Sequence, residues 1–264
     1  ELTQPEFFAE QLKGVDTVIH NAAMVSFKKA DAQKIYEANV IGTRYLAQAA
    51  REAGCKNFIF ISSISAVEFR PPQITEETMI PKLESKRKDD IYGYTKLLSE
   101  NELIEMAGDM RIIILNPSVI LGPGSERVET LIKAVRKMPF LPIMDYVNAF
   151  VDVRDVARAV TLALTKGRSG ERYIVSSHNA RMVEFTREIV KYIKKDLRVV
   201  VLSPFGLSLM DGFVSLLDFL HLNPGVRRPS QMNIDKPCSY EKIKREMGWE
   251  PTFTLEQSII DSIT

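Results

Sequence analysis

Several residue types are scarce in this chain, and each shortage excludes a class of protein. The sequence has 264 residues, of which two are cysteine, three are histidine and one is tryptophan. Cys55 and Cys238 cannot form a disulfide framework, and no group of cysteines and histidines has metal-ligand spacing. The formal net charge is +1, so an overall basic surface for nucleic acid is not expected. We therefore predict a protein with no metal site and no nucleic-acid partner.

The chain also lacks the pattern of a signal peptide, an internal repeat and a low-complexity tract. Free thiols suit a reducing compartment, so we expect a cytoplasmic location. With 45% hydrophobic and 26% charged residues, the composition indicates one large globular domain or two modest ones.

The first half of the sequence alternates apolar strand patterns with helical patterns. Strands are predicted at residues 15–20, 57–61 and 111–115, and helices at residues 5–13, 32–53 and 89–107. Gly14 and Gly54 follow the first two helices, where glycine commonly ends a helix. The strand at 57–61 is apolar at nearly every position, as in a parallel strand that is covered on both faces. This alternation predicts a doubly wound α/β sheet.

Small or polar residues follow each of these three strands. They occupy residues 20–23, 62–65 and 116–119. Ligands of open α/β sheets bind beyond the carboxyl ends of the strands. The agreement among three strands predicts a binding crevice at that edge.

The second half is less regular after Gly124. We expect helices at 128–137, 154–165 and 182–194, and strands at 149–153, 171–176 and 198–202. This mixture indicates the last units of the sheet interwoven with a smaller lobe.

Residues 205–222 form the most apolar helical stretch. Asp211 and Asp218 within it make a membrane span a poor interpretation, and the absence of lysine disfavours a membrane-surface helix. A narrow polar stripe repeats at helical spacing: Ser208, Asp211, Ser215 and Asp218. The remaining surface is apolar: Leu209, Met210, Phe213, Leu216, Leu217 and Leu220. Burial in the lobe or in a dimer contact is one interpretation, and the wall of a pocket for an apolar substrate is another.

Tyr92 and Lys96 are four residues apart in the helical segment 89–107, so they share one helix face. An ammonium group near a phenol favours the phenolate and lowers the pKa of the tyrosine. Tyr92 is therefore a candidate acid/base, whereas Tyr94 lies on another face. The spacing also occurs in ordinary surface pairs.

These features occur together with further segments in an order that resembles a known family. The chain resembles the extended short-chain dehydrogenase/reductase superfamily, which includes nucleotide-sugar epimerases, dihydroflavonol reductases and 3β-hydroxysteroid dehydrogenases. The matching segments are Val18-Ile19-His20-Asn21-Ala22-Ala23, Asn39-Val40-Ile41-Gly42-Thr43, Phe60-Ile61-Ser62-Ser63, Tyr92-x-x-x-Lys96, Asn116-Pro117-Ser118-Val119-Ile120-Leu121-Gly122-Pro123-Gly124, Phe150-Val151-Asp152-Val153-Arg154-Asp155-Val156-Ala157 and Met247-Gly248-Trp249-Glu250-Pro251.

The resemblance implies roles for individual residues. It makes Tyr92 the catalytic acid/base, Lys96 the residue that lowers its pKa and holds the nicotinamide ribose, and Ser63 the partner of the reacting oxygen. Ser62 and Ser65 are alternatives to Ser63, and all three serines also suit a turn. The cofactor-binding residues that it implies are Ala22, Ala23, Asn39, Ile61, Ser62, Tyr92, Lys96, Asn116, Pro117, Ser118 and Val119. Asn39 and Asn116 also have structural interpretations, as a mid-helix polar residue and as a strand cap.

The resemblance further implies a Rossmann-type fold with a small mixed α/β substrate-binding lobe. The NAD(P)-binding domain is expected at 1–125 with parts of 145–178, and the lobe at about 126–145 and 179–264. The family's Gly-x-x-Gly-x-x-Gly turn is missing from this sequence, so we expect an N-terminally truncated sheet with exposed apolar flanks on strands 15–20 and 58–61.

The expected function is an NAD(P)-dependent oxidoreductase that acts on a hydroxyl or ketone. A nucleotide-sugar epimerase or dehydratase that uses the same triad is the alternative, and Arg181, Arg227 and Arg228 could hold its phosphates. The expected cofactor is NAD or NADP. The resemblance also suggests a homodimer through helices 32–53 and 89–107, with apolar contacts from Tyr45, Leu97, Leu98 and Ile104.

Overall fold

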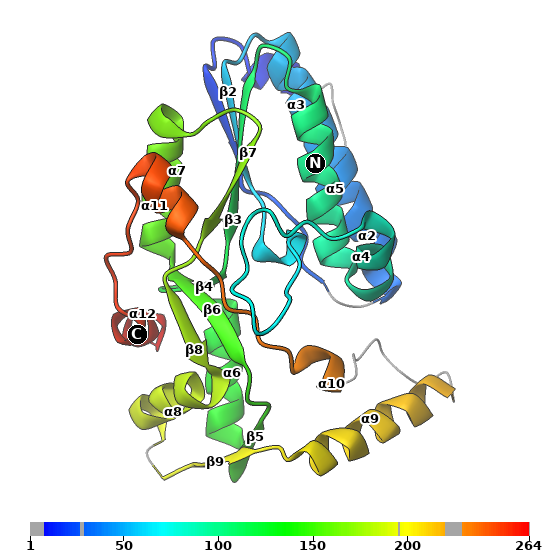
Figure 1. The fold of residues 1–264 in the computed structure, drawn as a ribbon, viewed down its shortest axis with the longest axis vertical. Helices are drawn as coiled ribbons and strands as arrows, with labels where there is room; N and C mark the ends of the chain where they lie inside the picture. Colours follow the sequence, from blue (N-terminus) through cyan, green and yellow to red (C-terminus); the bar gives the residue numbers. More distant parts are fainter. Residues whose placement is uncertain (1–7, 27–28, 195, 220–228, 264) are drawn as a thin grey trace.

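A four-stranded parallel sheet forms the centre of the upper part of the molecule (Figure 1). The computed structural model describes residues 8–26, 29–194, 196–219 and 229–263. The strand order is β1-β2-β3-β7, and every neighbouring pair is parallel. The four strands are β1 (Thr17–His20), β2 (Asn57–Ile61), β3 (Arg111–Pro117) and β7 (Glu171–Val175). The predicted α/β class with a parallel sheet is confirmed.

Helices cover both faces of this sheet. On one side lie α3 (Gly42–Glu52) and α5 (Ile91–Met106), and on the other lie α7 (Val153–Lys166) and α11 (Glu241–Met247) (Figure 1). Successive residues of β2 alternate between the two faces. Phe58 and Phe60 therefore pack in the core under α3 and α5, whereas Ile59 and Ile61 pack in the core under α7 and α11. This burial on both sides explains why β2 is apolar throughout.

The exposure predicted for the strand flanks is wrong for β2. Phe58 and Ile59 are fully buried because β2 lies between β1 and β3. It holds in part for β1, the edge strand, where Ile19 is 49% exposed.

The helical segment predicted at 32–53 is continuous but contains a π turn. It consists of α2 (Ala32–Tyr36), the π-helical turn η3 (Glu37–Ile41) and α3. Inside this turn the carbonyl oxygen of Asn39 accepts a hydrogen bond from the Ser99 hydroxyl of α5 at 2.8 Å. A π turn widens the helix locally and often marks a functional position. Here it brings Asn39 against the helix that carries Tyr92.

The lower part of the molecule contains two small sheets with helices beside them. One sheet has the order β4-β6-β8, in which β6 pairs with β4 in parallel and with β8 in antiparallel fashion. The other consists of β5 and β9 in parallel. The elements are β4 (Val119–Leu121), α6 (Glu126–Lys137), β5 (Phe140–Ile143), β6 (Val147–Asp152), β8 (His178–Arg181), α8 (Met182–Ile193) and β9 (Arg198–Val201).

Residues 249–253 are hydrogen-bonded to Asp155 at the start of α7. The indole of Trp249 is fully buried and donates to the carbonyl oxygen of Asp155 at 2.9 Å. The Asp155 carboxylate accepts from the backbone N–H groups of Thr252 and Phe253. Two of the family-like segments, 150–157 and 247–251, are thus in direct contact and stabilise the fold.

Several short elements carry no strong sequence signal and were not predicted. They are the strands β4, β5 and β8, and the helices α4 (Leu83–Asp89), α10 (Pro229–Met232), α11 and α12 (Leu255–Ile263), with the 3₁₀ turns η2 (Lys29–Asp31) and η4 (Ile64–Ala66). The helix predicted at 5–13 is represented by α1 (Phe8–Gln11), and residues 5–7 lie outside the described residues.

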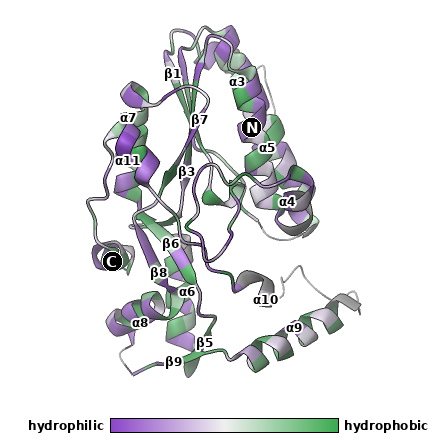
Figure 2. Cartoon of the chain, in the orientation of Figure 1, coloured by the Kyte–Doolittle hydropathy of each residue, from purple (hydrophilic) through white to green (hydrophobic). Residues whose placement is uncertain are grey.

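Helix α9 (Pro204–Phe219) projects from the lower part of the molecule (Figure 1). Hydrophobic residues recur along its length (Figure 2). Phe205 is 79% exposed and Phe213 is 62% exposed, whereas Leu207 and Val214 are buried. The prediction that this helix is buried in the lobe is therefore wrong for the face that carries Phe205 and Phe213. Residues 220–222 of the predicted helix lie outside the described residues. Within the described ranges, no helix combines the length and apolarity that a membrane span requires.

Candidate active site

The site is built where β2 ends beside the first turn of α5. The backbone N–H of Gly93 donates to the side chain of Asp90 at 3.1 Å, and this cap starts α5 just before Tyr92. The Ser63 hydroxyl forms a hydrogen bond with the Tyr92 phenol. The same serine oxygen accepts from the backbone N–H of Ser65 at 3.1 Å. Ser63 thus has both the turn role and the contact with tyrosine.

Gly93 allows α5 to approach this turn closely. A Cβ atom at this position would overlap the carbonyl oxygen of Ser65 and would lie 2.5 Å from the Asp90 carboxylate and 2.7 Å from Lys86 Cε. The nearest of these atoms belongs to the backbone, which cannot rotate away. Glycine beside Tyr92 is therefore a packing requirement of the site.

Lys96 lies one helical turn beyond Tyr92 and is 2% exposed. Its ammonium group donates to the carbonyl oxygen of Ile61 at 2.9 Å and lies 4.7 Å from the centre of the Phe60 ring. Burial lowers the pKa of Lys96 to about 8, and the Glu100 carboxylate opposes this shift. The lysine therefore reaches the end of β2 at the backbone of Ile61.

The structure corrects the pKa expected for Tyr92. Burial raises the pKa of the Tyr92 phenol above its ordinary value, the hydrogen bond from Ser63 lowers it and the nearby Asp90 raises it. The predicted depression by Lys96 is not seen, because desolvation of the phenolate is the larger effect and the ammonium group is directed to the Ile61 carbonyl.

Asn39 fixes the loop that follows β1. Its side-chain oxygen accepts from the backbone N–H of Met24 at 2.7 Å, and its amide donates to the Met24 carbonyl oxygen at 3.0 Å. The amide also lies 3.3 Å from the Thr95 hydroxyl on α5. Ala22 and Ala23 are exposed in the same loop. The side chain of Asn39 therefore has a structural role, because it fixes the backbone at Met24, next to the exposed Ala22 and Ala23.

The segment after β3 carries buried polar atoms that have no partner among the described residues. These atoms are the side-chain oxygens of Asn116 and Ser118, together with that of Ser176 after β7. Pro117 is the last residue of β3 and Val119 begins β4, so Ser118 alone lies between the two strands. A buried polar atom without a partner costs free energy and marks a position where a ligand or water can bind.

Sequence reasoning missed Glu100, which is fully buried beneath the end of β2. Its carboxylate accepts hydrogen bonds from Ser62 Oγ, from the amide of Asn116 at 2.6 Å and from the guanidinium of Arg172 at 2.6 Å. Its spacing of four residues from Lys96 was a signal that could have identified it.

His20, at the end of β1, is also buried behind the site. Its Nε2 lies 2.8 Å from the Thr43 hydroxyl, and its ring stacks on Phe60 with centroids 5.5 Å apart. Burial, and to a smaller extent the nearby Lys96, lower the pKa of His20 to about 4. His20 is therefore neutral at physiological pH and structural, as expected.

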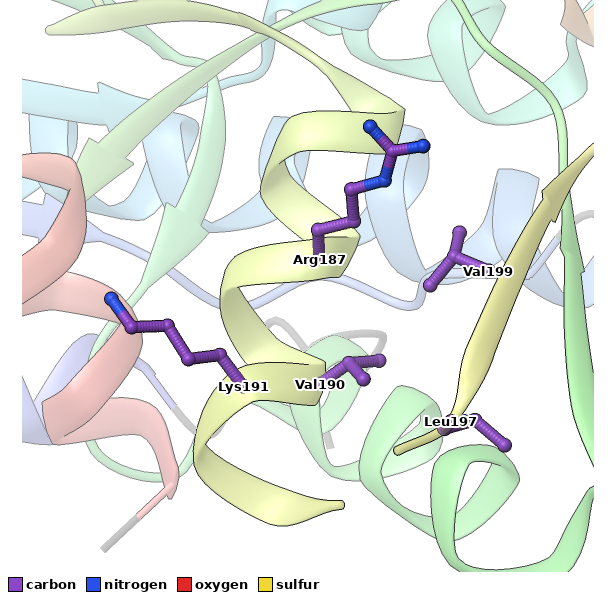
Figure 3. Close-up of a pocket in the computed structure, with 5 residues that line it drawn as sticks. All are labelled: Arg187, Val190, Lys191, Leu197 and Val199. Atoms are coloured by element: carbon purple, nitrogen blue, oxygen red, sulfur yellow. The ribbon is translucent and has the colours of Figure 1, made fainter. Parts of the chain in front are cut away.

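A separate hollow of about 430 Å³ lies between α8 and the segment that leads into β9 (Figure 3). Val190, Leu197 and Val199 form its apolar part, and Arg187 and Lys191 stand along α8 (Figure 3). Lys191 pairs with Glu188 at 2.9 Å. None of the predicted site residues lines this hollow.

Comparison with known proteins identifies the class. The sequence pattern of the NAD dependent epimerase/dehydratase family matches residues 1–176, so the chain belongs to this family of NAD(P)-dependent enzymes. This agrees with the resemblance to the extended short-chain dehydrogenases/reductases.

Individual relatives have different activities. The chain is 28% identical to sterol demethylase protein B of Methylococcus capsulatus over 93% of this chain and 77% of the relative. It is 26% identical to UDP-glucose 4-epimerase of Vibrio cholerae over 95% of this chain and 76% of the relative. The crystal structure of gox2253 superimposes with a TM-score of 0.83 at 26% identity, covering 100% of this chain and 82% of that one. Both a sterol enzyme and a sugar epimerase are therefore among the relatives.

The residues at this edge of the sheet fit the nicotinamide end of the family's cofactor. Ser118 and Ser176 lie at the carboxyl ends of β3 and β7, and their buried hydroxyls have no partner in the part of the chain that the structure describes, so they can bind an amide group. The Lys96 ammonium has three donors, one of which is used by Ile61, so it can also donate to a ribose hydroxyl. The exposed Ala22 and Ala23 leave the backbone after β1 accessible.

Proposed function

We propose that this protein is an NAD(P)-dependent oxidoreductase that interconverts a hydroxyl and a ketone, with Tyr92, Ser63 and Lys96 as its catalytic residues. The observation that carries the proposal is the hydrogen bond between the Ser63 hydroxyl and the Tyr92 phenol at the end of β2. When bound, the nicotinamide supplies or accepts the hydride that the protein's own side chains cannot carry.

The chain's residues would perform the proton transfer and the positioning. The Tyr92 phenol donates a proton to the substrate oxygen as a ketone is reduced, and it takes the proton back in the opposite direction. The Ser63 hydroxyl donates a hydrogen bond to the same oxygen and stabilises the charge that develops there. Lys96 lies one helical turn beyond Tyr92, and the Ile61 carbonyl oxygen holds its ammonium group, whose other donors can bind the nicotinamide ribose. Asn39 keeps the loop of Ala22 and Ala23 in place for the cofactor.

An apolar alcohol or ketone is the proposed substrate class. Helix α9 presents large exposed apolar side chains, among them Phe205, Leu209 and Phe213, which supply more apolar surface than a lobe helix needs for packing. The relative whose name refers to sterols supports the same class. We propose that this face of α9 forms one wall of the substrate pocket.

A nucleotide-sugar epimerase or dehydratase is the second candidate, favoured by the relative that is a UDP-glucose 4-epimerase. Of the arginines that could hold a diphosphate, Arg181 is already paired with Asp145 at 2.6 Å. Arg227 and Arg228 lie outside the described residues. The pairing of Arg181 supports the oxidoreductase over the epimerase.

The decisive variant is Tyr92→Phe, which removes the transferred proton and keeps the ring. Turnover should fall by about a hundredfold or more, while the change in nicotinamide fluorescence on adding NADH or NADPH remains. Tyr94→Phe is the matched control and should retain turnover. A ketone panel and a UDP-sugar panel separate the two candidate functions. Near-normal turnover in Tyr92→Phe, or turnover of UDP-sugars alone, would contradict the proposal.

The homodimer through the helices at 32–53 and 89–107 also remains a proposal. Leu97 must be removed from its contact residues, because it is fully buried within the protomer. Tyr45, Leu98 and Ile104 are partly exposed and remain candidates for a self-complementary helix pair. Light scattering at micromolar concentration should give twice the mass of the 29.9 kDa chain, and a monomeric mass would contradict the dimer.

A further inference from the structure

Three side chains on one face of α5 contact three consecutive residues at the end of β2. The Tyr92 phenol is hydrogen-bonded to Ser63, and the Lys96 ammonium donates to the carbonyl oxygen of Ile61 at 2.9 Å. One turn further on, the Glu100 carboxylate accepts from the Ser62 hydroxyl. Spacings of four residues place all three side chains on the same face. Helix α5 therefore contacts each of the residues 61–63 through a different side chain.

Glu100 also reaches Ser63 indirectly, through Asn116. The Asn116 amide donates to Glu100 Oε1 at 2.6 Å and to the Ser63 carbonyl oxygen at 3.0 Å. Glu100 thus binds the Ser62 hydroxyl directly and holds the Ser63 carbonyl oxygen through the Asn116 amide. The carbonyl oxygen and the hydroxyl of Ser63 belong to the same residue, so fixing the first restricts where the second points.

The charge of Glu100 is compensated within the same network. Arg172 on β7 donates from Nε to Glu100 Oε2 at 2.6 Å and from Nη2 to Asn101 at 2.8 Å. A fully buried carboxylate without such partners would be strongly destabilising. With them, residues from β3, β7 and the turn after β2 are joined to α5 at one carboxylate.

We propose that Glu100 is a positioning residue whose carboxylate fastens residues 61–63 to α5 and thereby sets the Ser63 hydroxyl against Tyr92. This rests on the proposed function, since the positioned groups are the proposed catalytic residues. Glu100 itself touches neither substrate nor cofactor and acts only through Ser62, Asn116 and Lys96.

The same carboxylate maintains the charge of Lys96. The titratable groups that interact with this lysine are His20 from β1 and Glu100 from α5, and Arg172 from β7 pairs with Glu100. His20 is neutral at physiological pH and Arg172 is cationic, so Glu100 supplies the negative charge near Lys96. Because burial already lowers the pKa of Lys96 to about 8, loss of the Glu100 charge should leave this lysine largely neutral in its working range.

The test compares Glu100→Gln with Glu102→Gln in the intact chain. Glu102 is a matched control, because it lies on the same helix and is also ion-paired, but to Arg44 at 2.6 Å and away from β2. The first readout is the NMR titration of the Lys96 side chain, assigned by its loss in Lys96→Met. The second is the pH profile of kcat and KM with the ketone panel.

Glu100→Gln should lower the pKa of Lys96 and decrease kcat by roughly tenfold or more with little change in KM, and the alkaline limb of the profile should move to lower pH. Glu102→Gln should leave the Lys96 pKa, kcat, KM and the alkaline limb unchanged. An unchanged Lys96 titration together with kcat within about twofold of wild type would overturn the inference.

Failure of the two proposals can be told apart. If the wild type turns over no ketone, the proposed function fails, whereas the Lys96 titration still decides the role of Glu100. If Glu100→Gln does not fold, Ser62→Ala removes one link and keeps the Arg172 ion pair intact. In that variant kcat should fall severalfold at unchanged KM, and an unchanged kcat would count against the positioning role.

Discussion

The neutral His20 makes stability depend on pH in a way that can be calculated from the structure. Its side chain is buried, its Nε2 lies 2.8 Å from the Thr43 hydroxyl, and burial lowers its pKa from 6.5 to about 4. The unfolded chain therefore binds a proton on this residue at higher pH than the folded chain does. Stability from this group is present above about pH 6.5 and is lost as the pH falls towards the folded pKa.

The size of the loss follows from the two pKa values. With 6.5 for the unfolded and about 4 for the folded state, the free energy of unfolding should fall by about 2 kcal/mol at about pH 5 and by about 3 kcal/mol at about pH 4. Local opening of the folded state around the charged ring would reduce this loss.

The assay is urea unfolding of the wild type and of His20→Gln at several values between about pH 7.5 and pH 4. Glutamine keeps a polar group near the position of Nε2 and does not titrate. All other titrating groups are common to both proteins, so the difference between the two curves isolates His20. If both proteins lose the same free energy over this range, the buried neutral histidine is not the cause and the reasoning is refuted.

Two other substitutions, each paired with a control substitution, test the packing around the site and the exposure of α9. Gly93→Ala should destabilise the chain by about 1–3 kcal/mol in urea unfolding, because the new methyl group would meet the Ser65 carbonyl oxygen, whereas Gly212→Ala, which has open space around it, should be neutral or stabilising by up to about 1 kcal/mol. Equal effects of the two alanines would contradict the close approach. Phe213→Ala should change stability by less than about 1 kcal/mol, because this side chain is 62% exposed, and should mainly raise KM for an apolar ketone. Val214 is buried, so Val214→Ala should lower the free energy of unfolding by about 2 kcal/mol. A loss of about 3–5 kcal/mol in Phe213→Ala would instead show that Phe213 packs in a core.

The local sequence pattern was sufficient for the main strands and for most helices. β2 and β3 are apolar at nearly every position and are covered on both faces, so burial left a pattern that is visible in a few consecutive residues. The shared helix face of Tyr92 and Lys96 depends only on helical spacing, whereas the role of Ser63 was expected from the family resemblance. Elements with three or four residues, such as β4 and β8, are held by pairing with distant strands and leave no such pattern.

Tertiary structure alone decided the electrostatics of the site and the surroundings of α9. The pKa of Tyr92 is raised because burial outweighs the lysine that the spacing placed nearby, and burial is a property of the assembled core. The sequence shows only the four-residue spacing of Glu100 from Lys96, whereas its partners Ser62, Asn116 and Arg172 are distant in sequence and are brought to it by the fold. The sequence shows that α9 is apolar, but which side faces solvent depends on what packs against it. Periodicity is encoded in neighbouring residues, whereas desolvation and charge pairing depend on contacts between residues far apart in the chain.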